Sequence, residues 1–118
     1  MKRLMLKSKI HKATVTGTNK NYEGSLSLDE NLMEAAEMVA FEQVHVYNIT
    51  NGERFVTYLI KAKKGSGEVE VKGAAAHKAA KGDKIIIATY AGVEDEEIDY
   101  FLPKILIMDE DNKIKEIK

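Results

Sequence analysis

The dipeptide Gly24-Ser25 has the clearest chemical potential in this 118-residue sequence. A serine hydroxyl that follows a glycine can attack the carbonyl of that glycine and exchange the amide bond for an ester. Glycine favours the attack because it reaches backbone conformations that are strained for other residues. Loss of the ester by β-elimination leaves dehydroalanine, which hydrolyses to a pyruvoyl group, an electrophile that replaces a bound cofactor. Taken alone, the dipeptide is more often a loop that enters a strand, here at 25–28.

Arg54 is a second candidate, because lysine supplies nearly every other cation and Arg3 is the one other arginine. The guanidinium group offers a planar pair of donors that can grip a carboxylate, which lysine cannot imitate. An ordinary surface arginine is an equally good interpretation of the composition. The three histidines, His11, His45 and His77, show no metal-ligand spacing, so structural roles are expected for them.

The composition argues against several classes of function. The length fits one domain, and 44% hydrophobic with 31% charged residues is typical of a globular protein. A formal net charge of -1 with dispersed lysines argues against nucleic-acid binding. No apolar run approaches the roughly 20 residues that cross a bilayer, and no signal peptide is evident. With no cysteine in the chain, thiolate chemistry is excluded. We therefore expect a cytoplasmic protein with no membrane partner.

Short runs of β-branched and aromatic residues predict a mainly β fold. Asn51-Gly52 predicts a hairpin turn between two of these runs. Asp29 can cap a helix that reaches about Met38, with Val39 among its apolar positions, and a second helix is expected at 73–80. These elements fit a compact β-barrel or an α+β domain. The strands are expected at 3–10, 13–16, 44–49, 55–60, 69–71, 84–90 and 105–108.

Several short motifs follow one another along the chain. They are Met5-Leu6 with Lys9 and His11, Tyr22-Glu23-Gly24-Ser25, Asn48-Ile49-Thr50-Asn51-Gly52-Glu53-Arg54-Phe55, Thr57-Tyr58, Gly73-Ala74-Ala75-Ala76-His77 and Gly82-Asp83. Each motif is weak alone, and their combination is specific. Their order and spacing resemble those of the bacterial aspartate 1-decarboxylase family, which is pyruvoyl-dependent. The resemblance holds from the N-terminus to about Ala91 and fades in the acidic stretch that follows.

The resemblance implies a double-psi β-barrel and a homotetramer with active sites between neighbouring subunits. It implies self-cleavage between Gly24 and Ser25, which would give a short β chain (1–24) and a longer α chain (25–118). The implied reaction converts L-aspartate to β-alanine and carbon dioxide for pantothenate and coenzyme A biosynthesis. The implied cofactor is the pyruvoyl group made from Ser25, with neither a metal nor pyridoxal phosphate.

The family's functional residues map onto matching positions. Ser25 becomes the pyruvoyl group that forms a Schiff base with the substrate amine, and Tyr58 returns a proton after carbon dioxide leaves. Thr57 contacts substrate and takes part in self-processing with Gly24. The remaining substrate-binding positions are Lys9, Arg54, Gly73, Ala74 and Ala75.

Local chemistry agrees with several of these roles. Arg54 could hold the carboxylate that is not removed, and N–H groups after Gly73 could bind an anion if a helix begins there. Thr57 and Tyr58 are adjacent, so their side chains point to opposite faces of an ideal strand. Both can serve one site if the strand twists or bulges, or they serve sites on two subunits.

Lys72 departs from the family, which usually has asparagine at this position. A lysine amine there could form an internal Schiff base, contact the substrate carboxylate, or extend into solvent on its flexible stem. The sequence favours the third placement, because Arg54 and Lys9 already serve the substrate. Two rival functions stay open: an inert barrel that keeps Gly24-Ser25 intact, and a decarboxylase that prefers glutamate or another small amino acid.

Overall fold

Nine strands and three short helices make up the computed structural model, which describes residues 1–118. The predicted mainly β class is confirmed. No helix exceeds six residues, and none is long and apolar enough to cross a membrane. The helices are α1 (Glu30–Ala35) and the 3-10 helices η1 (Gly73–Lys78) and η2 (Asp95–Tyr100). The strands are β1 (Lys2–Thr14), β2 (Gly17–Asn19), β3 (Ser25–Asp29), β4 (Gln43–Asn48), β5 (Arg54–Ala62), β6 (Val69–Lys72), β7 (Lys84–Glu94), β8 (Lys104–Met108) and β9 (Ile114–Ile117).

The strands form one mixed sheet in the order β2-β6-β3-β5-β4-β7-β1-β8-β9. The chain leaves β1 through Val15 and Thr16 and continues into β2, which pairs with β6 at the opposite end of the order. Thr16 N–H donates to the carbonyl of Val69 (2.8 Å), the first residue of β6. The sheet therefore curls back on itself, which is consistent with the predicted barrel. Its double-psi connectivity stays a prediction.

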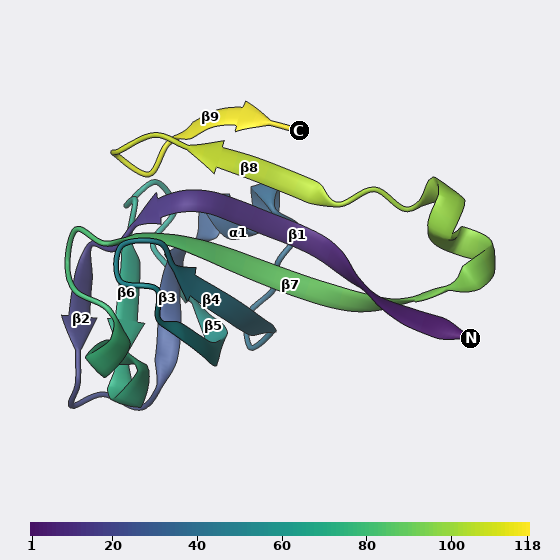
Figure 1. The fold of residues 1–118 in the computed structure, drawn as a ribbon. Coiled ribbons are helices and arrows are strands. Elements are labelled where there is room, and N and C mark those ends of the chain that lie inside the picture. Colours follow the sequence, from purple (N-terminus) through teal and green to yellow (C-terminus); the bar gives the residue numbers. More distant parts are fainter.

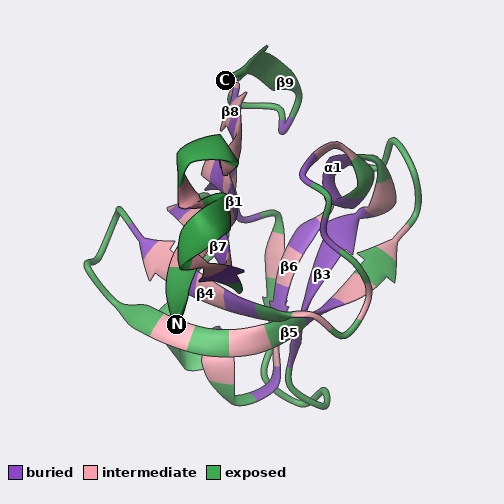
Figure 2. Ribbon diagram, turned by 90° about the vertical axis from the view of Figure 1, so that its right-hand side faces the viewer, coloured by how far each residue is buried: buried purple, intermediate pink, exposed green.

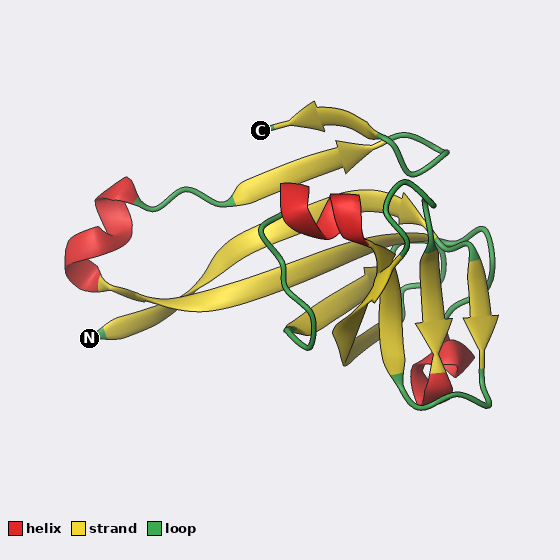
Figure 3. Cartoon of the chain, turned by 180° about the vertical axis from the view of Figure 1, so that it is seen from behind, coloured by secondary structure: helices red, strands yellow, loops and turns green.

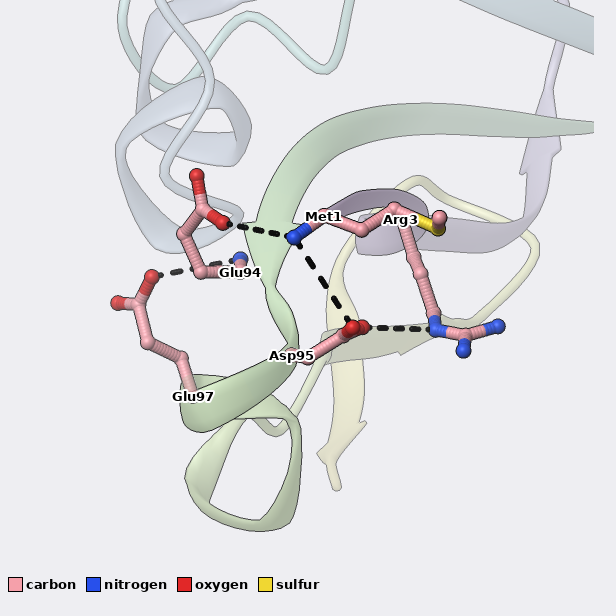
Figure 4. Close-up of polar contacts among 5 residues, drawn as sticks. All are labelled: Met1, Arg3, Glu94, Asp95 and Glu97. Atoms are coloured by element: carbon pink, nitrogen blue, oxygen red, sulfur yellow. Dashed lines mark hydrogen bonds and ion pairs between the residues drawn. The ribbon is translucent and has the colours of Figure 1, made fainter.

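Strands β1 and β7 extend beyond the other strands as a two-stranded arm that ends in η2 (Figures 1 and 3). The arm gives the molecule its longest dimension, 44 Å against 27 and 25 Å. At its tip the Met1 ammonium lies 3.6 Å from the Glu94 carboxylate, and Arg3 donates to Asp95 at 2.9 Å (Figure 4). Because both ion pairs are exposed, they contribute little to the stability of the arm.

The core lies between the curled strands and α1. It contains 18 buried apolar residues, among them Ile10, Leu26, Leu59, Val71 and Ile87. Strand β4 alternates buried and partly buried residues, as a strand with one face on the core should. Strand β3 is buried at every residue, because β5 and β6 flank it and α1 follows directly (Figure 2). A residue at the start of β3 is therefore shielded from water.

Several predicted elements differ in extent. Residues 3–10 and 13–16 were expected as two strands, but β1 is continuous to Thr14 and absorbs two register shifts, with Lys12 at a φ of 66°. The first helix ends at Ala35 instead of reaching Met38, and Val39, expected on its apolar face, is 64% exposed. The second helix is a six-residue 3-10 turn. The predicted hairpin turn is confirmed, with Gly52 at a φ of 78° between β4 and β5.

Asp29 ties together the far end of β3, helix α1 and the turn before β6. Its carboxylate is buried and accepts hydrogen bonds from the N–H groups of Asn31 (2.8 Å), Gly65 (3.0 Å) and Gly67 (2.9 Å). The first of these bonds is the helix cap predicted from the sequence. The other two anchor the β5–β6 connection, so β3 is fixed at the end opposite Ser25.

Replacing Asp29 with alanine should lower the free energy of unfolding by about 2–3 kcal/mol. The change removes a helix cap and leaves two further backbone N–H groups without their acceptor. Urea denaturation in a Ser25→Ala background, which removes the hydroxyl expected to cut the chain, measures the effect. Asp99→Ala on the exposed η2 is the control and should change stability by less than about 0.5 kcal/mol. Equal stabilities for the two variants would contradict this role for Asp29.

Candidate active site

The Gly24-Ser25 bond lies at the boundary between an exposed loop and a buried strand. Residues 20–24 are exposed, whereas Ser25, the first residue of β3, is 1% exposed. Ser25 pairs with Lys72, the last residue of β6. Its Oγ is buried and has no hydrogen-bond partner in the chain. A buried hydroxyl without a partner costs free energy and is uncommon in folded proteins, so its position calls for an explanation.

Gly73 makes the tightest backbone contact of the site. A Cβ built on Gly73 would lie 2.5 Å from the Cα of Gly24, 2.6 Å from its N and 2.9 Å from the carbonyl oxygen of Tyr22. Gly73 also has a φ of 74°, a conformation that L side chains rarely adopt. The loop that precedes Ser25 therefore rests on Gly73 in a space that no other residue would leave open.

Tyr58 lies beside Ser25 in the sheet. Leu26 of β3 pairs in parallel with Leu59 of β5, and the same register one residue earlier aligns Ser25 with Tyr58. The β4–β5 ladder runs without a register shift through Thr57 and Tyr58, so their side chains lie on opposite faces. The bulge considered from the sequence is therefore absent here. Tyr58 is 38% exposed, with its ring 6.4 Å from that of Phe41.

The two candidate carboxylate-binding cations lie away from Ser25 within one chain. Arg54 is four residues before Tyr58 on β5, about 13 Å along an extended strand. Lys9 is on β1, and three strands separate β1 from β3 in the sheet. One chain therefore brings together Gly24, Ser25, Gly73 and Tyr58, and leaves both cations elsewhere.

The Arg54 side chain lies against the ring of Tyr47, which is hydrogen-bonded to Tyr90. The Arg54 guanidinium carbon lies 4.6 Å from the centre of the Tyr47 ring, and the Tyr47 hydroxyl is 2.7 Å from that of Tyr90. This hydrogen bond, with burial, raises the pKa of Tyr47 above its usual value, and Arg54 partly offsets the rise. Sequence reasoning missed both tyrosines, because nothing local indicates that they meet. Arg54 lines a pocket of about 270 Å³ with Tyr47, Asn48, Ile49, Gly52, Glu53 and Ile86.

The Lys72 side chain does not extend into solvent, so that prediction is wrong. Its ammonium lies 4.3 Å from the centre of the Tyr22 ring, in the loop before the Gly24-Ser25 bond. A second correction concerns Gly73 to Ala75, which were expected to begin a helix with a useful dipole. They begin a 3-10 helix of six residues, which is too short to supply one.

Comparison with known proteins identifies the family. A family model described as aspartate decarboxylase matches residues 1–115. The chain belongs to the aspartate decarboxylase family. An aspartate 1-decarboxylase of Cupriavidus necator is 52% identical over 118 residues, which cover the whole chain and 98% of that protein. One from Syntrophus aciditrophicus is 54% identical over 115 residues, covering 98% of this chain and 99% of the relative.

Membership in the aspartate decarboxylase family confirms the resemblance found in the motifs. The match is longer than those motifs indicated, since it runs past Ala91 through the arm, η2 and most of the tail. The acidic η2 therefore belongs to the shared fold.

Gly73→Ala should slow the self-cleavage predicted from the sequence at Gly24-Ser25 by at least about tenfold, or roughly 1.4 kcal/mol in barrier, because the new Cβ would push Gly24 away. Intact-mass measurement of the cut fraction against time tests this. Gly52→Ala is a matched control: Gly52 has a φ of 78° and nothing within 4 Å of a built Cβ. Similar cleavage rates in the two variants would contradict a role for the contact between Gly73 and Gly24.

Proposed function

We propose that the chain is the proenzyme of a pyruvoyl-dependent aspartate 1-decarboxylase, which cuts itself into residues 1–24 and 25–118. Membership in the aspartate decarboxylase family makes the chain a carboxy-lyase that acts on aspartate. The relatives' shared name supports L-aspartate as substrate and β-alanine and carbon dioxide as products. These products would supply pantothenate and coenzyme A biosynthesis, which fits a cytoplasmic enzyme.

The unpartnered hydroxyl of Ser25 is the observation that carries this proposal. No side chain or backbone group of the chain engages it, so a lone pair is free to attack. Its target, the carbonyl of Gly24, belongs to the adjacent residue on a loop held against Gly73. Burial of Ser25 excludes bulk water from competing attack. The site thus holds nucleophile and electrophile together, which is the condition for an intramolecular reaction.

The cleavage chemistry balances with one water. Attack by Ser25 Oγ forms an ester with Gly24 and frees the Ser25 nitrogen as an amine. Elimination removes the Cα proton and expels the Gly24 carboxylate, which leaves dehydroalanine at position 25. Addition of water then releases ammonia and gives the pyruvoyl group. When formed, this group supplies an electrophilic carbonyl that takes up the electron pair left by carbon dioxide.

The remaining roles follow from charge and position. Arg54 can hold the retained carboxylate of aspartate with two parallel hydrogen bonds, and Lys9 can add a second positive charge. Tyr58, aligned with Ser25, is the proton donor. Gly73, Ala74 and Ala75 offer backbone N–H groups to the substrate. Thr57 lies on the other face of β5 from Tyr58 and serves the site of a neighbouring subunit. Because Arg54 and Lys9 lie away from Ser25 in one chain, we propose that neighbouring subunits of a homotetramer complete each site.

Ser25→Ala should give a folded, uncut chain without β-alanine formation, because alanine has no hydroxyl to attack Gly24. Denaturing mass spectrometry should show two fragments for the parent protein and one intact chain for the variant. Ser66→Ala, in an exposed turn, is the control and should be cut normally. An intact parent chain would favour the inert barrel, and β-alanine formation by the Ser25 variant would rule out the pyruvoyl mechanism.

Arg54→Lys should keep self-cleavage and lose roughly tenfold to a hundredfold in kcat/KM for aspartate. Lysine keeps the charge but lacks the paired donors, a difference of about 1.5–3 kcal/mol for a charge-assisted contact. Steady-state kinetics on fully cut protein, with glutamate assayed in parallel, measure the change and the preference. Arg3→Lys in the arm is the matched control. Unchanged kinetics would show that Arg54 is an ordinary surface residue. Faster turnover of glutamate than of aspartate would indicate a different substrate.

A further inference from the structure

The loop that carries the scissile bond passes over the end of β6. Strand β6 lies between β2 and β3, and residues 20–24 join β2 to β3 across its last residue, Lys72 (Figure 1). Lys72 pairs with Asn19 on one side and with Ser25 on the other. The main chain of Lys72 is thus fixed to both ends of the loop.

Few contacts hold the loop itself. The N–H of Asn21 donates to Asn19 Oδ1 (3.1 Å), the only hydrogen bond outside the strand ladders that involves residues 20–24. Lys20 and Glu23 form no ion pair. Two further contacts hold the loop. Its backbone packs against Gly73, and the Lys72 ammonium lies over the face of the Tyr22 ring.

We propose that Lys72 is a positioning residue for self-cleavage. Its ammonium binds the face of the Tyr22 ring, and this Lys72–Tyr22 contact, called the clip below, keeps the Gly24 carbonyl within reach of Ser25. Its main chain holds the residue that carries the nucleophile, and its side chain holds the loop that carries the electrophile. The clip rests on the proposed self-processing and adds a role for the cation that stands where the family usually has asparagine. A cation over an aromatic ring at a half-exposed site contributes about 0.5–1 kcal/mol, so its loss corresponds to a slowing of about twofold to fivefold.

The test is the first-order rate of cleavage, followed by intact mass from a defined start in a reconstituted translation mixture. Lys72→Met and Tyr22→Leu should each slow cleavage about twofold to fivefold, and the double variant should be no slower than the slower single variant, because both remove one contact. Lys72→Arg and Tyr22→Phe keep a cation and a ring, and should cut at close to the parent rate. Lys20→Met removes a lysine from the same loop without touching the contact and is the matched control.

The outcomes separate the two proposals. Normal cleavage of Lys72→Met and Tyr22→Leu, or slowing that multiplies in the double variant, would overturn the clip and leave the self-processing proposal standing. Slow cleavage of Lys72→Arg and Tyr22→Phe would also overturn it, because a cation over a ring would then be insufficient. A parent chain that stays uncut would overturn both proposals. Coupled slowing, with recovery in the conservative variants, would support the clip.

Discussion

Gly24 and Gly73 approach so closely that a single methyl group on Gly73 would collide with the backbone of Gly24. Much of the processing site depends on this contact. It fixes the position of the loop 20–24 over the end of β6, and it therefore also fixes the direction from which the chain enters β3. Burial of β3 then shields Ser25 from bulk solvent and leaves its hydroxyl without a hydrogen-bond partner. The energetic cost of that isolation is met by the apolar packing of the strand and by Asp29 at its other end.

The proposed cut divides the molecule unevenly. Residues 1–24 carry β1 and β2, whereas residues 25–118 carry every other strand and all three helices. Strand β1 nevertheless lies between β7 and β8, and its Ile10 and Ala13 are fully buried. The short fragment is therefore an internal part of the sheet and also supplies Lys9. Neither fragment contains a complete set of the proposed site residues.

The local features of the fold could be predicted from the sequence, because they depend on neighbours in the chain. The β-branched runs became strands, Asn51-Gly52 became a hairpin turn, and Asp29 became a helix cap. Predictions failed where distant residues decide. The continuity of β1 depends on its pairing with β7. Val39 is exposed because α1 ends early. The Lys72 side chain is positioned by Tyr22, which lies 50 positions earlier in the chain. Gly24 and Ser25 were found because their chemistry is contained in two adjacent residues. The packing of Gly24 against Gly73 could be recognised only in the folded chain.

The position of β1 has a consequence for how the protein can be assembled. In the uncut chain, β1 is tethered and reaches its place between β7 and β8 by an intramolecular search, at a rate independent of concentration. Once the bond is broken, an unfolded molecule must recover the same strand by collision of two separate polypeptides. Refolding then becomes second order, and dilution favours the separated fragments. With the proposed cut, the two fragments would keep an architecture that formed in the uncut chain and that they would regain only slowly once unfolded.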